Sequence, residues 1–166
     1  MTAQRRRSYE SGHRPKFLVV IDGTPESSRA VHFAARRAAR IGGSVVMLAV
    51  AEPPESFEWL GVGDAMREEA EEEAGAMLEA AAASARSVAG VDPEQVVRLG
   101  DRLVAIAGLI EEDEDIAFLV LAAGTAKEGP GPLVSGLAGK AASTFPIPIV
   151  IVPGSLSDEE IDALAG

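Results

Sequence analysis

Five short apolar runs recur along the chain and alternate with segments of helical periodicity. The runs cover Lys16–Ile21, Ser44–Val50, Gln95–Leu99, Ile116–Ala123 and Ile149–Val152. Most are apolar almost throughout, which is typical of strands buried on both faces of a parallel sheet. Strands that alternate with helices predict βαβ units with right-handed crossovers. We therefore expect an α/β fold: an open, doubly wound parallel sheet with helices on both faces.

Composition limits the functions that such a fold could carry. The 166 residues suit one domain, and the net charge of −11 disfavours contact with a nucleic-acid backbone. The chain has no cysteine, which removes disulfides and thiol catalysis. Its two histidines, His13 and His32, lack the spacing of a zinc motif, so no metal site is expected.

The two ends of the chain differ in character from the middle. Residues 1–14 are polar and basic, which predicts a disordered arm, or alternatively a contact to an acidic partner such as the protein's own acidic helix. Residues 15–153 form the expected domain, and residues 154–166 a tail. In that tail Ser157 and Glu160 form a capping box that predicts a short helix over Asp158–Leu164.

Neither a membrane span nor a secretory signal is expected. No apolar run approaches the roughly 18 residues that cross a bilayer, and no apolar stretch follows the N-terminal arginines. A cytoplasmic protein without a membrane partner is the default expectation.

The connections between the apolar runs predict helices and loops. A helix is expected from a Thr24 cap to about Ile41, with Pro25 in its first turn, and a longer one over Asp64–Ala89. A further helix is expected over Val134–Thr144. The Pro-containing connection 51–63 carries Trp59, and it is long enough to be a lid, or simply to dock on the domain or a partner subunit.

Two loops are expected to converge on one crevice. Asp22–Pro25 follows the first strand, and the glycine-rich loop Gly124–Pro132 follows the fourth. In an open α/β sheet, ligands bind beyond the carboxyl ends of the strands where the strand order reverses. Backbone N–H groups beside a helix N-terminus favour an anion, so a phosphate-bearing ligand would bind here.

Four motifs together resemble the universal stress protein family. They are VVIDGTPESSRA at Val19–Ala30, RLGD at Arg98–Asp101, LVLAAG at Leu119–Gly124 and FPIP at Phe145–Pro148. The resemblance spans about Pro15–Pro153 and implies strand order 3-2-1-4-5. It also implies a homodimer paired through the last strand, residues 149–152. One branch of the family binds ATP, and another lacks nucleotide.

The resemblance implies site residues, although the glycine motif of the ATP-binding branch is altered here. Asp22, in the turn with Gly23 and Thr24, matches the acid that contacts the ribose; the alternative is a turn residue that bonds nearby amides. The remaining matches are Val50 for the adenine edge, Gly124 and Thr125 for ribose and phosphate, and Ser135 and Gly136, loosely, for the phosphate end. Lys127 replaces the second glycine of the motif and the loop is about two residues short.

Prolines further reduce the amide donors of this loop. Pro130 and Pro132 carry no N–H, which leaves Gly129, Gly131, Ser135 and Gly136 as donors for a remodelled phosphate site. The alternative is a rigid connection without a ligand.

Three functions remain open. The first is a stress-response or signalling module that binds ATP or AMP as a dimer. The second is a nucleotide-free dimeric interaction protein of the same fold. The third, a slow ATP hydrolase, has the least support, because the chain has no P-loop and Asp22 has no evident partner base.

Overall fold

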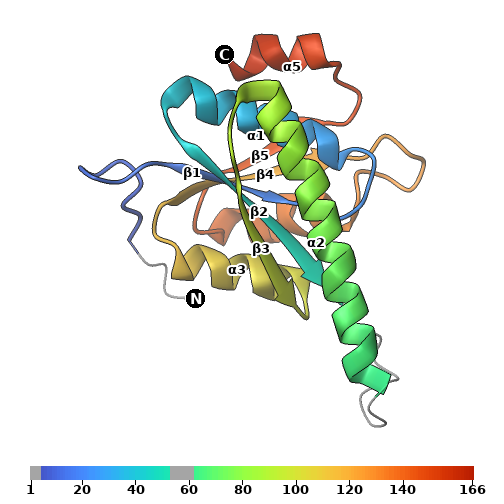
Figure 1. Ribbon diagram of the computed structural model, residues 1–166. Coiled ribbons are helices and arrows are strands. Elements are labelled where there is room, and N and C mark those ends of the chain that lie inside the picture. The colour runs from blue at the N-terminus through green and yellow to red at the C-terminus, as the bar shows by residue number, and fades with distance from the viewer. Residues whose placement is uncertain (1–4, 53–61) are drawn as a thin grey trace.

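The computed structural model describes residues 5–52 and 62–166, and its centre is a five-stranded, wholly parallel sheet (Figure 1). The strand order is β3-β2-β1-β4-β5, which confirms the expected fold. The strands are β1 (Lys16–Val20), β2 (Ser44–Ala51), β3 (Glu94–Leu99), β4 (Ile116–Ala123) and β5 (Ile149–Pro153). The helices are α1 (Ser27–Ile41), α2 (Val62–Ala89), α3 (Arg102–Glu112), α4 (Pro132–Ala138) and α5 (Asp158–Ala165), with a 3₁₀ helix at Lys140–Thr144.

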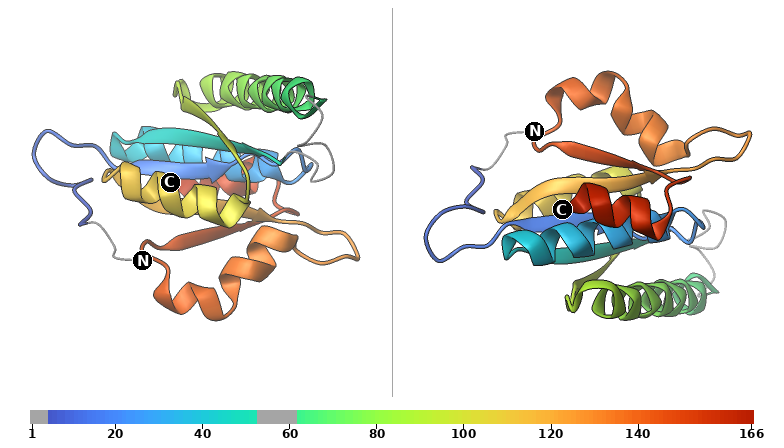
Figure 2. Two further views of the ribbon diagram at one scale, coloured as in Figure 1. Left: turned by 90° about the horizontal axis from the view of Figure 1, so that it is seen from below. Right: turned by 90° about the horizontal axis from the view of Figure 1, so that it is seen from above.

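Alternate residues of each strand face two separate cores, because side chains in a strand point to opposite sides. Phe17 and Val19 of β1 pack with α1, α2 and α5 on one face. Leu18 and Val20 of the same strand pack with α3 and α4 on the other. The two views of Figure 2 show these faces, with α3 over the sheet in one and α5 over it in the other. The central strands are therefore apolar beyond their first residues, Lys16 of β1 and Ser44 of β2.

Strand β1 lies between β2 and β4, and this position creates the switch point. It pairs in parallel with Ser44–Leu48 on one side and with Ile116–Val120 on the other. The connections after β1 and β4 leave the sheet toward opposite faces, α1 on one and α4 on the other. The loops that follow these strands therefore flank a crevice at the carboxyl edge of the sheet.

Helix α1 begins later than the sequence predicted. Its first residue is Ser27, and its N-cap position is Glu26, whose side chain makes no capping bond. The expected cap, Thr24, instead donates its hydroxyl to Asp22. Thr24 therefore belongs to the turn before the helix, and the expectation of Thr24 as cap with Pro25 in the first turn was wrong.

The helix expected over Val134–Thr144 is two shorter elements. Helix α4 already begins at Pro132, which suits a first helical position because its missing N–H would have no intrahelical partner there. It ends before Gly139, whose φ of −85° and ψ of −137° interrupt the helical path, and the 3₁₀ helix follows. As a result Ser135 and Gly136 lie inside α4 and not at its N-terminus.

Residues 5–14 pack on the sheet domain, which differs from the expectation of a disordered arm. The Arg6 guanidinium donates to the carbonyls of Asp113 and Ile116, and the Arg7 amide donates to the carbonyl of Glu114. Ser8 is buried, and His13 Nδ1 lies 2.6 Å from Asp115 Oδ1. The acidic turn between α3 and β4 thus binds this basic segment, whereas the alternative expectation had named an acidic helix of the protein.

We expect Arg6→Ala to lower the free energy of unfolding by about 1.5–3 kcal/mol, because hydrogen bonds from a charged group to half-buried carbonyls are lost. That loss corresponds to a drop of about 4–10 °C in melting temperature. Arg5→Ala is the matched control, since the Arg5 side chain is 84% exposed and makes a surface ion pair with Glu10. Equal melting temperatures for the two variants in a calorimetric scan would show that the segment contributes nothing to stability.

The C-terminal helix α5 also docks on the domain. Ser157 and Glu160 form the predicted capping box, and Ile161 and Ala165 are fully buried. His32 of α1 is buried and lies 2.6 Å from Asp162 of α5, and Arg36 reaches the same carboxylate at 2.9 Å. The hydrogen bond with His32, helped by Arg36, lowers the pKa of Asp162 below its ordinary value. His32 thus acts as a structural link between α1 and α5.

Most of connection 51–63, including Trp59, lies outside the described residues. Among the helices that are described, none is long and apolar enough to cross a membrane.

Candidate functional site

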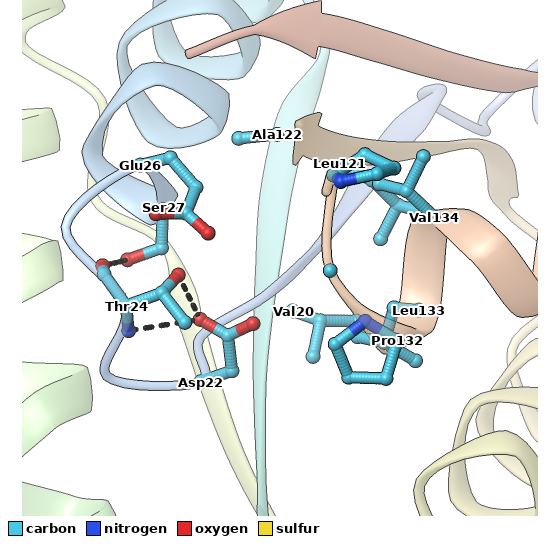
Figure 3. A pocket seen from close by; sticks show the side chains of 12 residues that line it. Val20, Asp22, Thr24, Glu26, Ser27, Leu121, Ala122, Pro132, Leu133 and Val134 are labelled. Atoms are coloured by element: carbon cyan, nitrogen blue, oxygen red, sulfur yellow. Dashed lines mark hydrogen bonds between the residues drawn. The ribbon is translucent and has the colours of Figure 1, made fainter. Parts of the chain in front are cut away.

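The crevice lies where the loops after β1 and β4 meet at the carboxyl edge of the sheet (Figure 3). Its floor comes from the ends of the two strands, with Val20 on β1 and Leu121 and Ala122 on β4. One wall carries Asp22, Thr24, Glu26 and Ser27, and the opposite wall is formed by residues 130–134. The structure thus brings together the two loops that the sequence predicted to converge.

Asp22 holds the turn between β1 and α1. Its Oδ1 accepts the Thr24 hydroxyl at 2.6 Å and the Thr24 amide at 3.1 Å. Gly23, between them, has a φ of 77°, a left-handed conformation that glycine adopts without strain. Among the described residues none bonds to Oδ2, so this oxygen can accept from a ligand. The turn role and the ligand role are therefore compatible.

The glycine-rich loop uses most of its amides internally. The Gly124 amide donates to the carbonyl of Pro130, and the Gly129 amide to that of Ala126. Ser135 donates to Gly131 as part of the first turn of α4. The amides of Leu133 and Val134 remain without a helical acceptor, as at the start of any helix. The expectation that Gly129 and Ser135 offer free donors was wrong for this conformation.

The cavity between the walls has a volume of about 30 Å³. That is enough for a water molecule, whereas small-molecule sites typically enclose about 300–1,000 Å³. The residues of both walls are therefore in place, but in this conformation the space between them is too small for a nucleotide.

The structure divides the ten predicted site residues into two groups. Three of them line the cavity, namely Asp22, Thr24 and Gly131. The others lie outside its lining: Gly23, Val50, Gly124, Thr125, Gly129, Ser135 and Gly136. Val50, at the end of β2, is half-buried on the α3–α4 face. Thr125, Ser135 and Gly136 are exposed.

Glu26 is the one charged side chain of the cavity lining that was not among the predicted site residues. Its Oε1 lies 2.9 Å from the position that a Cβ atom on Gly124 would occupy, and its own Cβ lies 3.2 Å from the corresponding position on Gly154. Gly124 thus leaves the space that the Glu26 carboxylate fills, whereas a Cβ on Gly154 would first meet the carbonyl oxygen of Ala123. The only signal in the sequence was an acid at the start of a helix, which ordinarily indicates an interaction with the helix dipole.

Ligand atoms for a metal ion come together elsewhere, in one group of described residues. Single atoms of His13, Glu114 and Asp115 lie within 4.8 Å of one another. His13 and Asp115 already bond to each other, and Arg7 lies 3.6 Å from Glu114. These contacts explain why the three side chains lie together: they attach residues 5–14 to the domain.

The sequence and the structure were each compared with known proteins, and the comparisons identify one family and one shared fold. The sequence model of the Universal stress protein family matches residues 13–153. A search among curated protein sequences gives no match. The structure of the universal stress protein UspA from Lactobacillus plantarum matches with a TM-score of 0.67 and 15% identity, over 83% of this chain and 97% of that one.

Two further solved structures carry nucleotides. A universal stress protein in complex with cAMP matches with a TM-score of 0.57 and 20% identity, over 85% of this chain and 98% of that one. The universal stress protein from Archaeoglobus fulgidus in complex with dAMP matches with a TM-score of 0.58 and 18% identity, over 83% and 96%. At these identities the likeness establishes a shared fold.

Proposed function

This chain belongs to the universal stress protein family, and on that premise we propose that it is a stress-response or signalling module that binds an adenine nucleotide. The observation that carries the proposal is the convergence of Asp22 and residues 130–134 on one crevice at the switch point of the sheet. Two structures of the same fold hold adenine nucleotides, cAMP and dAMP.

Within this proposal the sugar lies at Asp22 and the phosphate end faces the glycine-rich loop. The free Oδ2 of Asp22 accepts a ribose hydroxyl while Oδ1 keeps the turn with Thr24. The remaining predicted contacts are Val50 for the base, and Gly124, Thr125, Gly129, Gly131, Ser135 and Gly136 for the phosphates. They require the loop 124–131 to move away from Glu26, since the present cavity of about 30 Å³ cannot hold a nucleotide.

Direct binding tests this function. We expect adenosine or AMP to bind the purified parent protein with a one-to-one stoichiometry in equilibrium dialysis. Guanosine should bind more weakly, because the contact proposed for Val50 is to the adenine edge. Mass analysis of what co-purifies after gentle denaturation provides an independent measurement. If no adenine compound binds at millimolar concentration, the nucleotide function is excluded.

The closed crevice also supports a second candidate, a nucleotide-free interaction protein of the same fold. The Gly124–Gly131 loop bonds the amides of Gly124 and Gly129 internally and the cavity is small, so the crevice keeps this conformation without a ligand. The same dialysis experiment distinguishes the two functions, because only the first predicts a bound nucleotide.

We further propose that the protein acts as a homodimer paired through β5. This strand is at one end of the sheet order, so its outer edge has no partner strand within the described chain. Ile151 on this strand is 38% exposed, although most residues of the sheet are buried. An apolar edge of this kind recruits another strand, and a second copy of the chain presents the same edge.

A further inference from the structure

Glu26 places a second carboxylate in the crevice beside that of Asp22. Figure 3 shows both side chains on the same wall, across the crevice from Pro132 and Val134. The Glu26 Oε1 atom occupies the space directly over the Cα atom of Gly124, at 2.9 Å from the position of a Cβ there. That is the space in which the family resemblance places ribose and phosphate.

Among the residues that line the cavity, no positive side chain offsets these two carboxylates. The twelve residues that line the cavity include no lysine, arginine or histidine. Within the described ranges, no hydrogen bond or ion pair reaches the Glu26 carboxylate. Two negative charges therefore share one half-buried wall.

Three of the amides that could bind a phosphate here are occupied, and those of Leu133 and Val134 are left without a helical acceptor. Those of Gly124 and Gly129 donate within the loop, and that of Ser135 donates within α4. A triphosphate entering here would therefore face two carboxylates, with few free amide donors to offset them. In contrast, the hydroxyls of a ribose are donors, and two carboxylates are suitable acceptors for them.

We propose that Glu26 sets how many phosphates the bound ligand can carry. The crevice accepts adenosine or an adenosine monophosphate whose phosphate extends into solvent, and it rejects the triphosphate. This specificity rests on the proposed adenine nucleotide site. At the short separations inside a partly buried site, each opposed pair of like charges weakens binding by about ten- to a hundredfold.

The test removes the charge of Glu26 and keeps its shape. Equilibrium dialysis with adenosine, AMP and ATP, in the presence of EDTA, compares the parent with Glu26→Gln. We expect the parent to bind adenosine at least about tenfold more tightly than ATP. Glu26→Gln should strengthen ATP binding by about ten- to a hundredfold and leave adenosine nearly unchanged.

The matched control is Glu111→Gln. Glu111 is exposed on α3 and outside the crevice, so this variant has the same net charge as Glu26→Gln. It should bind all three ligands like the parent. A second measurement needs no variant: added salt screens the repulsion and should bring the affinity for ATP closer to that for adenosine. This measurement decides the question if Glu26→Gln does not fold.

The outcomes separate this inference from the proposed function. If the parent binds ATP as tightly as adenosine and neither salt nor Glu26→Gln changes the ratio, the role of Glu26 is overturned and the nucleotide function stands. If the parent binds nothing and Glu26→Gln binds ATP, the nucleotide function of the parent fails, whereas the exclusion by Glu26 is supported. If neither protein binds any of the three ligands, both are overturned.

Discussion

Ile151→Asp is expected to convert the proposed dimer into a monomer, with the dimer dissociation constant raised by more than about a hundredfold. In a two-fold symmetric pairing through β5, the strand meets its own copy, so one substitution introduces a carboxylate on each side of the contact. Both charges would lose water on association, and they would repel each other. Sedimentation equilibrium of the parent and the variant measures the effect.

The opposite edge of the sheet supplies the control. Val97 on β3 is 37% exposed, close to the 38% of Ile151, so Val97→Asp introduces the same charge at a similar exposure. It should leave the dimer intact, and circular dichroism should show both variants folded. Dissociation by Val97→Asp alone would move the interface to β3, and a parent that is monomeric at micromolar concentration would remove the dimer altogether.

The fold could be predicted from the sequence because the information for it is local. Strand β4 (Ile116–Ala123) is largely buried on both faces, so every residue in it is apolar and the run is visible without any partner. The capping box of Ser157 and Glu160 was predicted correctly for the same reason, since both residues lie within one turn.

The errors arise where distant residues decide the outcome. Thr24 has the right chemistry for a helix cap, but its hydroxyl bonds to Asp22 and the helix begins later. Residues 5–14 lack apolar periodicity, yet Arg6 finds backbone carbonyls at Asp113 and Ile116 that only the folded chain places beside it. Composition describes such a segment as disordered, because hydrogen bonds to distant carbonyls leave no pattern in the sequence.

The candidate site also has features that could be predicted from the sequence and others that depend on contacts between distant residues. The sequence placed Asp22 and the glycine-rich loop at one crevice from topology alone, and the structure brings Asp22 and Gly131 to the same cavity. The sequence alone could not show that Glu26 fills the space over Gly124, because that contact depends on how the start of α1 lies against the ends of β4 and β5. A glycine in this loop therefore accommodates a side chain, in addition to any role in binding phosphate.

Asp22→Ala is expected to weaken the binding of adenosine by about ten- to a hundredfold, the effect of losing one charge-assisted hydrogen bond of about 1.5–3 kcal/mol. The variant also loses the acceptor for the Thr24 hydroxyl and amide, so its melting temperature should fall as well. Asp22→Asn separates these roles, because its amide oxygen can still accept from Thr24 while the charge that attracts the ribose hydroxyls is gone. We expect Asp22→Asn to melt like the parent and to bind adenosine less tightly. If adenosine binds both variants as tightly as the parent, Asp22 is a turn residue only, and the sugar must lie elsewhere in the crevice.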